Sequence, residues 1–287
     1  MSETSLNERI KRKVGRAVKT SRQVLRNLAT SERQPARAMF VFGAQRSGTT
    51  ITGKVLGRSS HIISYLEGNP HAFDGMVLKD DATIVKLVED SPFPYVLFKP
   101  ICESHRAAEL LSLFPGSKAI WIFRNFRDMA NSGVKKWGHG RRNLKDLAEG
   151  NLEAASWRAG GLTPEKLAFV RKFYHDEMIP HAAFSVLWYI RNGLYFDLKF
   201  HEHPDILLVK YEDLVTQPTV YFKRAFDFID CPFEEKFVED IFDTSIGKHP
   251  FPEIPEEILA RCEELQHKLE RVYASRAENT GITERRD

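Results

Sequence analysis

A glycine-containing loop at residues 43–50 is the first segment that could bind an anion. Its sequence, GAQRSGTT, has the spacing of a phosphate-binding P-loop, with Thr49 where triphosphatases have lysine. Glycines let the backbone approach a phosphate, and N–H groups at the start of the next helix can cradle it, with a hydroxyl added by Thr50. The lysine that reaches the β- and γ-phosphates of a triphosphate is absent, and Arg46 lies within the loop instead. We therefore expect an anionic ligand other than a nucleoside triphosphate.

A second possible anion site begins at Arg124, which follows the apolar stretch 118–123. Ser132 lies eight residues later, two turns into the next expected helix, and Lys136 is a further candidate one turn beyond. A basic residue at a strand end and a hydroxyl on the following helix can converge on one anion. Two such sites favour a ligand with phosphate groups at two separate positions. ATP does not fit this description, because its phosphates form a single chain.

Together these segments resemble the sulfotransferases that use 3′-phosphoadenosine-5′-phosphosulfate (PAPS). The stretch QRSGTT is similar to the family's 5′-phosphosulfate loop, in the arginine form found in tyrosylprotein and carbohydrate sulfotransferases. Arg124 with Ser132 is similar to the 3′-phosphate motif, although Phe126 stands where the family often has proline. The resemblance implies that Arg46 faces the sulfate and the leaving phosphate. The loop residues expected to bind the donor are Arg46, Ser47, Gly48, Thr49 and Thr50.

Sulfuryl transfer to a hydroxyl also needs a general base within hydrogen-bond reach. Glu67 is the first candidate, because it follows Arg46 by 21 residues, a spacing similar to that of the catalytic glutamate in tyrosylprotein sulfotransferases. His105 is the second, since cytosolic members place a histidine just after the second strand, and His71 is the third. The alternatives are a surface carboxylate for Glu67 and structural roles for the histidines.

Further donor contacts follow from the same resemblance. Lys99 ends an apolar stretch where the family has a lysine that faces the donor sulfate. Tyr211, in the segment ILLVKYEDL, would approach the adenine. Lys248 and Ser245 lie in a later segment where the family often has a donor-binding residue. The alternative for ILLVKYEDL is a Walker B strand that holds Mg²⁺ for a kinase, which the missing loop lysine disfavours.

The elements that must position these residues form a pattern of apolar strands and helices. Strands are expected at residues 39–42, 95–99, 118–123 and 206–210. Helices are expected up to about residue 56 and at about 103–113, 128–137, 164–177, 180–201, 219–229, 234–242 and 256–273. This alternation predicts an α/β fold of three layers, a central parallel sheet flanked by helices, as in P-loop NTPases and the sulfotransferase fold. Such sheets bind ligands at the carboxyl ends of their strands, where these motifs lie.

Charge is spread unevenly along the 287 residues. Residues 1–37 hold ten Lys/Arg and three Asp/Glu, a charge of +7 in a chain of net charge +3, so the remainder carries 3 − 7 = −4. We expect a basic helical arm and linker at 1–37, which packs on the domain or contacts a membrane surface or polyanion, and a sulfotransferase domain at 38–287. This distribution disfavours a nucleic-acid binder. With no apparent signal peptide, membrane span or cysteine metal motif, the expected location is cytoplasmic.

The predicted function is in-line, metal-independent transfer of the sulfuryl group of PAPS to a hydroxyl or amine, leaving 3′-phosphoadenosine 5′-phosphate (PAP). By resemblance, the arginine-type loop and Glu67 favour a carbohydrate, glycolipid or peptide tyrosine as acceptor. A P-loop kinase that uses Mg-ATP on a small alcohol or nucleotide, and a nucleotide-binding protein without activity, are the alternatives. Residues 140–200 match no motif. Their aromatic side chains are expected in the core: Trp157, Tyr174, Trp188 and Tyr195.

Overall fold

A computed structural model describes most of the chain, namely residues 35–140, 142–243, 246–247 and 249–278, with Gly15, Val18, Ser21 and Gln23 before them. The expected arm and linker at 1–37 therefore lie almost entirely outside the described residues, and the domain boundary stays a prediction. Ser245 and Lys248 also lie outside them. Among the described helices, none is both long enough and apolar enough to cross a bilayer.

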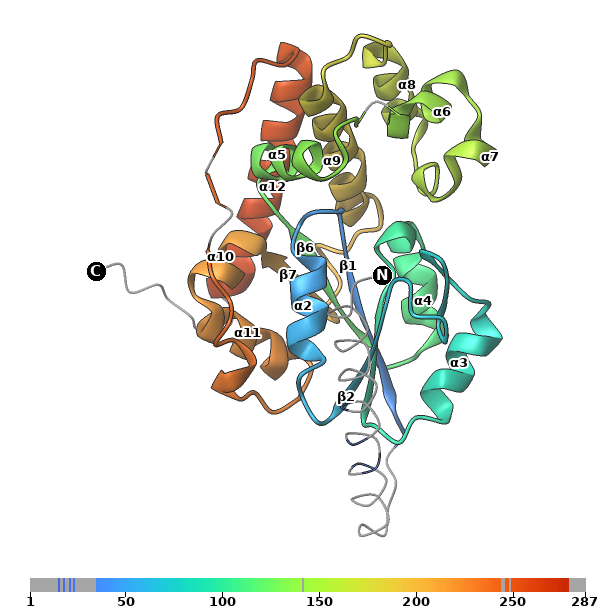
Figure 1. Ribbon diagram of the computed structural model, residues 1–287, viewed down its shortest axis with the longest axis vertical. Coiled ribbons are helices and arrows are strands. Elements are labelled where there is room, and N and C mark those ends of the chain that lie inside the picture. Colours follow the sequence, from blue (N-terminus) through green and yellow to red (C-terminus); the bar gives the residue numbers. More distant parts are fainter. Residues whose placement is uncertain are drawn as a thin grey trace, which may run out of the picture.

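The centre of the fold is a five-stranded parallel sheet with the strand order β2-β5-β1-β6-β7 (Figure 1). Its strands are β1 (Arg37–Gly43), β2 (Ile62–Leu66), β5 (Tyr95–Lys99), β6 (Lys118–Phe123) and β7 (Ile206–Lys210). They are nearly continuous apolar runs, as parallel strands covered on both faces usually are. Because β1 pairs with both β5 and β6, the loop that follows β1 starts at the middle of the sheet.

Helices cover both faces of this sheet and make three layers (Figure 1). One face packs on α2 (Thr49–Leu56), α10 (Tyr211–Thr216) and α11 (Pro218–Phe228). The other face packs on α3 (Asp81–Glu89), α4 (Ala107–Leu113), α9 (Pro180–Asp197) and α12 (Glu256–Glu278). Side chains alternate along each strand, so Val41 contributes to the first of these two cores, whereas Phe40 and Phe42 contribute to the second.

The remaining elements gather beyond the carboxyl ends of the strands, next to α9 (Figure 1). They are α5 (Phe126–Trp137), α6 (Arg142–Glu149), α7 (Leu152–Ala155) and α8 (Pro164–Phe173), with the short 3₁₀ turns η1 (Ile101–Arg106) and η2 (Ser156–Arg158). A two-stranded hairpin, β3 (Phe73–Asp74) and β4 (Val77–Leu78), follows β2, and a third 3₁₀ turn is η3 (Glu235–Phe237). These segments can therefore enclose a ligand above the sheet.

The predicted α/β architecture is confirmed, and β5, β6 and β7 have the predicted bounds. The sequence prediction missed β2, an edge strand whose short apolar pattern Ser64 interrupts, and it also missed α3, α6 and α7. The helix expected at 234–242 is wrong: only η3 forms there, because Glu234 is extended and Val238 leaves the helical region, although Phe237, Val238 and Ile241 have helical spacing and are buried. The helices expected at 164–177 and 180–201 end earlier, at Phe173 and Asp197.

Candidate active site

The loop at residues 43–50 connects β1 to α2 in the way that a P-loop requires. Gly43 and Gly48 both have positive φ angles, of 138° and 91°. A side chain on Gly43 would overlap the carbonyl of Ile122 on β6, and one on Gly48 would overlap the ring of Tyr211. Glycine is therefore needed at both positions for space as well as for conformation.

Some polar groups of this loop are available to a ligand, as far as the described residues show. Gly48 is the N-cap of α2 and has no side chain, so it offers no capping oxygen to the first N–H groups of the helix. The hydroxyl of Ser47 is buried and has no hydrogen-bond partner among the described residues. A buried hydroxyl of this kind usually has an ion or ligand to bind. Thr49 is buried and Thr50 is exposed on the same turn.

The two anion sites expected from the sequence lie against each other. Arg46, at a φ of 65°, donates from Nε to the Ser132 hydroxyl on α5, at 3.0 Å. Arg124, at the end of β6, donates from Nη1 to the carbonyl of Arg46 at 3.3 Å. The guanidinium of Arg124 also lies 4.5 Å from the ring centroid of Tyr211. Four residues from separate parts of the sequence thus converge on the loop.

Positive charge is concentrated at this convergence. Burial, and secondly the charge of Arg124, lower the pKa of Arg46. Two guanidinium groups close together stabilise a bound anion and are themselves stabilised by it. Lys136, the further candidate, is exposed near the end of α5. The geometry is therefore suited to a ligand with more than one negative charge.

Glu67 and Lys99 form a buried ion pair beside this loop. Leu66 of β2 pairs with Lys99 of β5, and this register brings Glu67, the next residue, to the lysine. The two side chains are only 5% and 4% exposed, and the second carboxylate oxygen of Glu67 accepts from the backbone N–H of Cys102 at 3.3 Å. Burial raises the pKa of Glu67 by more than Lys99 lowers it. Such a carboxylate is a stronger base than an exposed one.

The two histidine candidates are placed differently. The ring of His105 packs against Gly160, in the connection after η2. Burial, and then the charges of Arg191 and Arg106, lower the pKa of His105 to about 4. A side chain with so low a pKa is a weak base at neutral pH. His71 is exposed in the turn before β3. Of the three base candidates, Glu67 has the environment closest to that of a general base.

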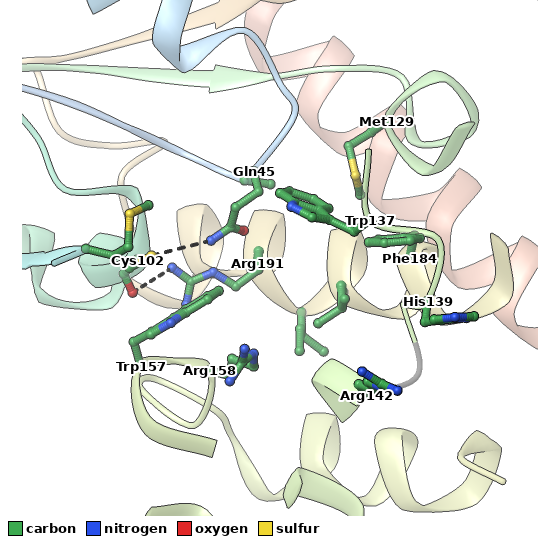
Figure 2. A pocket seen from close by; sticks show the side chains of 14 residues that line it. Gln45, Cys102, Met129, Trp137, His139, Arg142, Trp157, Arg158, Phe184 and Arg191 are labelled. Carbon is green, nitrogen blue, oxygen red and sulfur yellow. Dashed lines mark hydrogen bonds between the residues drawn. The ribbon is translucent and has the colours of Figure 1, made fainter. Parts of the chain in front are cut away.

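A pocket of about 400 Å³ opens next to the loop (Figure 2). Ala44 and Gln45 of the loop line one side, and Cys102, whose N–H holds Glu67, lines another. The Gln45 amide points at the Cys102 sulfur, 3.9 Å away (Figure 2). The rest of the lining comes from α5, α6, η2 and α9, from the segments beside them, and from Met76 in the turn between β3 and β4. A ligand in this pocket would lie next to the loop and to Cys102, whose N–H donates to Glu67.

Residues 140–200, which match no sequence motif, supply much of this lining. Trp157 was expected in the core but faces the pocket, as do three arginines that no sequence pattern singled out: Arg142, Arg158 and Arg191. Trp188 and Tyr195 are fully buried, as expected, whereas Tyr174 is half-buried. One local pattern near the pocket is visible in the sequence, the basic, glycine-containing run GHGRR at residues 138–142, but it carries no recognisable function. The pocket forms from helices distant in sequence, which is why the pattern did not reveal it.

Comparison with known proteins agrees with this architecture. Residues 36–250 of the 287 match the model of the sulfotransferase domain family, so the chain belongs to the sulfotransferases. No curated protein sequence matches the chain.

Solved structures of sulfotransferases are similar to this chain, and two of them share its fold at a TM-score of 0.50. A sulfotransferase from Alicyclobacillus acidocaldarius is 16% identical, with 85% of this chain and 97% of that chain covered and a TM-score of 0.50. The sulfotransferase domain from the curacin biosynthetic pathway is 18% identical, with 83% and 99% covered and a TM-score of 0.50. A mouse sulfotransferase crystallised with PAP is 14% identical, with 81% and 73% covered and a TM-score of 0.40.

Proposed function

We propose that this sulfotransferase transfers the sulfuryl group of PAPS to a hydroxyl or amine of an acceptor. The observation that carries the proposal is the convergence of Arg46, Arg124, Ser132 and Tyr211 on one loop, beside the buried pair of Glu67 and Lys99. Two cationic sites in contact suit a donor with two phosphate groups.

The donor site is assigned from the loop and from the side chains that lie against it. The Ser47 hydroxyl and the N–H groups from Gly48 to Thr50 would hold the 5′-phosphate. Arg124 and Ser132 would hold the 3′-phosphate, with the ring of Tyr211 against the adenine. Ser132 would then exchange its contact with Arg46 for the phosphate, which frees Arg46 for the bridging oxygen. Lys248 is retained as a donor contact by resemblance alone.

The acceptor side is assigned from burial and charge. PAPS supplies the sulfuryl group, which replaces one hydrogen of the acceptor. The released proton would pass to Glu67, whose buried carboxylate has a raised pKa. Arg46 and Lys99 would stabilise the negative charge that grows on the leaving oxygen. His105 stays a second, weaker candidate for the base.

The kind of acceptor is proposed from the pocket and the resemblance together. A carbohydrate, glycolipid or peptide tyrosine fits a pocket with tryptophan side chains, because sugar and phenol rings pack well on indole faces. Independence of metal ions, the cytoplasmic location and a membrane or polyanion contact of the arm all remain predictions.

The direct test is calorimetric binding of PAP in EDTA, with AMP and ATP as controls. We expect PAP to bind at least about tenfold more tightly than AMP, since charge-assisted hydrogen bonds hold its 3′-phosphate. Arg124→Ala should remove most of this preference. Equal affinity for PAP and AMP would contradict the proposal, and ATP turnover that requires Mg²⁺ would favour the kinase instead.

A further inference from the structure

The acceptor pocket combines apolar walls with an excess of positive charge. Arg142 of α6, Arg158 of η2 and Arg191 of α9 all line it, together with His139. None of the described lining residues is Asp or Glu. Figure 2 places Arg142 and Arg158 across the pocket from Gln45, and Arg191 on the side of Cys102. Pockets for uncharged ligands rarely gather three cations without a counter-charge.

Arg191 is the most buried of these cations. It is 3% exposed, and its Nη2 donates to the carbonyl oxygens of Ile101 and Cys102 at 2.8 and 3.3 Å. Its Nε and Nη1 have no hydrogen-bond partner among the described residues. Burial lowers the pKa of Arg191 to about 10, so the side chain is charged at neutral pH. A buried guanidinium with unused N–H groups favours a nearby anion.

Glu67 is the carboxylate that interacts electrostatically with Arg191, but it does not neutralise the positive charge of Arg191. Glu67 is ion-paired with Lys99, so the group of Glu67, Lys99 and Arg191 keeps a net positive charge. Arg158 adds a further positive charge to the pocket. Its Nε is buried without a hydrogen-bond partner in the described part of the chain, where Arg158 also forms no ion pair. Among the described residues, no carboxylate is ion-paired with Arg158 or Arg191, so these two cations are available to an anionic ligand.

Trp157 joins two of these cations into one surface. Its ring centroid lies 5.0 Å from the guanidinium carbon of Arg158 and 5.2 Å from that of Arg191. Cation–π contacts hold both guanidinium groups next to an indole face. An aromatic or alicyclic body can pack on such a face while its charged group reaches the arginines.

The three arginines are separate from the donor site. They lie on α6, η2 and α9, whereas the donor contacts proposed above lie on the loop, β6, α5 and α10. The proposed donor site therefore binds the phosphates of the donor without these three arginines. We propose that the acceptor is an amphipathic anion, that is, a hydroxyl compound with a ring-containing apolar body and a carboxylate or phosphate group. Arg158 and Arg142 bind the anionic group, and the nearby positive charge of Arg191 strengthens this binding. This inference rests on the proposed sulfotransfer.

The test compares an acid with its uncharged ester. 6-Hydroxy-2-naphthoate and its methyl ester are titrated into PAP-saturated wild-type protein, with 2-naphthyl phosphate as a parallel anion. We expect the carboxylate or the phosphate to bind at least about tenfold more tightly than the ester, as expected for a charge-assisted hydrogen bond. Arg158→Gln and Arg142→Gln should reduce that ratio to about threefold or less, chiefly by weakening the binding of the acid.

The matched control is Arg271→Gln, an exposed arginine on α12 away from the pocket, which should change neither affinity. Acid and ester binding equally well, or an unchanged ratio in Arg158→Gln, overturns the inference. PAP affinity is measured on the same samples. If PAP itself fails to bind, the proposed function is what has failed, whereas intact PAP binding with no anion preference rejects only this inference. Arg191 is not substituted, because its contacts with Ile101 and Cys102 support the fold.

Discussion

Glu67 has surroundings very different from those of an ordinary surface carboxylate. It is buried, it is paired with Lys99, and one of its oxygens accepts from the backbone of Cys102 at the wall of the acceptor pocket. Burial favours the protonated form and the lysine favours the charged form, with burial the larger effect. A carboxylate with a raised pKa binds a proton more readily than an exposed one, which suits the proposed role of Glu67 as a base.

Replacement of Glu67 by glutamine should lower turnover by about 10²–10⁴-fold, the range for loss of a general base. PAP affinity should stay within about twofold, because the shape of the side chain is kept. Turnover by PAP release and PAP titration measure the two effects, with the exposed Glu153→Gln as the control. If glutamine weakens PAP binding as strongly as turnover, Glu67 has a structural role only.

The pH profile tests the same residue independently. Glu67 acts as a base only when it is deprotonated, so turnover should fall as the pH decreases through its pKa. Because burial raises this pKa, the fall should begin at a higher pH than the ordinary value of about 4.3 for a glutamate. A profile of kcat against pH in wild-type protein measures the midpoint. A midpoint at or below the ordinary value would exclude Glu67 as the titrating base.

Arg46→Ala should reduce turnover by about 10²–10³-fold, the usual cost of removing one donor to a developing oxyanion. Arg46→Lys keeps the charge but loses the contact from Nε to Ser132, and it should recover part of the activity. Single-turnover rates at saturating donor separate this effect from binding. Unchanged rates in both variants would remove Arg46 from the mechanism.

At the scale of elements, the loop between β1 and α2 depends on α10 for its shape. The ring of Tyr211, the first residue of α10, occupies the space where a side chain on Gly48 would lie. The strand β7 places this tyrosine, and β6, its neighbour in the sheet, places Arg124 under the same ring. The loop is therefore shaped by two strands that follow it much later in the sequence.

Gly48→Ala should weaken PAP binding by about tenfold or more and should destabilise the fold, because alanine adds both strain and overlap with Tyr211. Gly116→Ala is the matched control: Gly116 also has a positive φ, of 78°, but nothing lies within 4 Å of an added methyl group. It should cost about 1 kcal/mol of stability and leave PAP binding intact. Equal PAP binding in both variants would contradict the proposed role of the packed loop.

Elements with long apolar runs could be predicted from the sequence, and those set by distant contacts could not. β5, β6 and β7 are continuous apolar segments, so their bounds follow from composition alone. β2 is short, lies at the edge and contains Ser64, and it becomes a strand only through its pairing with β5. Glu67 was a reasonable candidate by spacing, but its pairing with Lys99 depends on the register of that missed strand. The arginines around Trp157 belong to helices whose arrangement no local pattern contains.

At the scale of the whole molecule, ligand binding and stability are linked. The proposed donor contacts join the loop, β6, α5 and α10, so PAP would connect both sides of the sheet centre. A ligand at 100 times its dissociation constant stabilises the native state by about 2.7 kcal/mol, which is on the order of 5 °C in melting temperature for a domain of this size. Thermal unfolding with and without PAP measures this shift. Arg124→Ala should lose most of the shift, and a shift of the same size with AMP would argue against a 3′-phosphate site.

The proposed donor and acceptor sites lie on different parts of the fold, and this separation has a consequence for protein engineering. The proposed donor contacts come mainly from strand ends and the loop, whose backbone positions are fixed by the core, whereas the proposed acceptor pocket is lined largely by side chains on α5, α6, η2 and α9. Arg142, Trp157 and Arg158 can therefore be substituted without a change in donor binding. A directed-evolution library confined to these three positions should yield enzymes with exchanged acceptor preference and a common donor, which makes this chain a suitable scaffold for engineered sulfation.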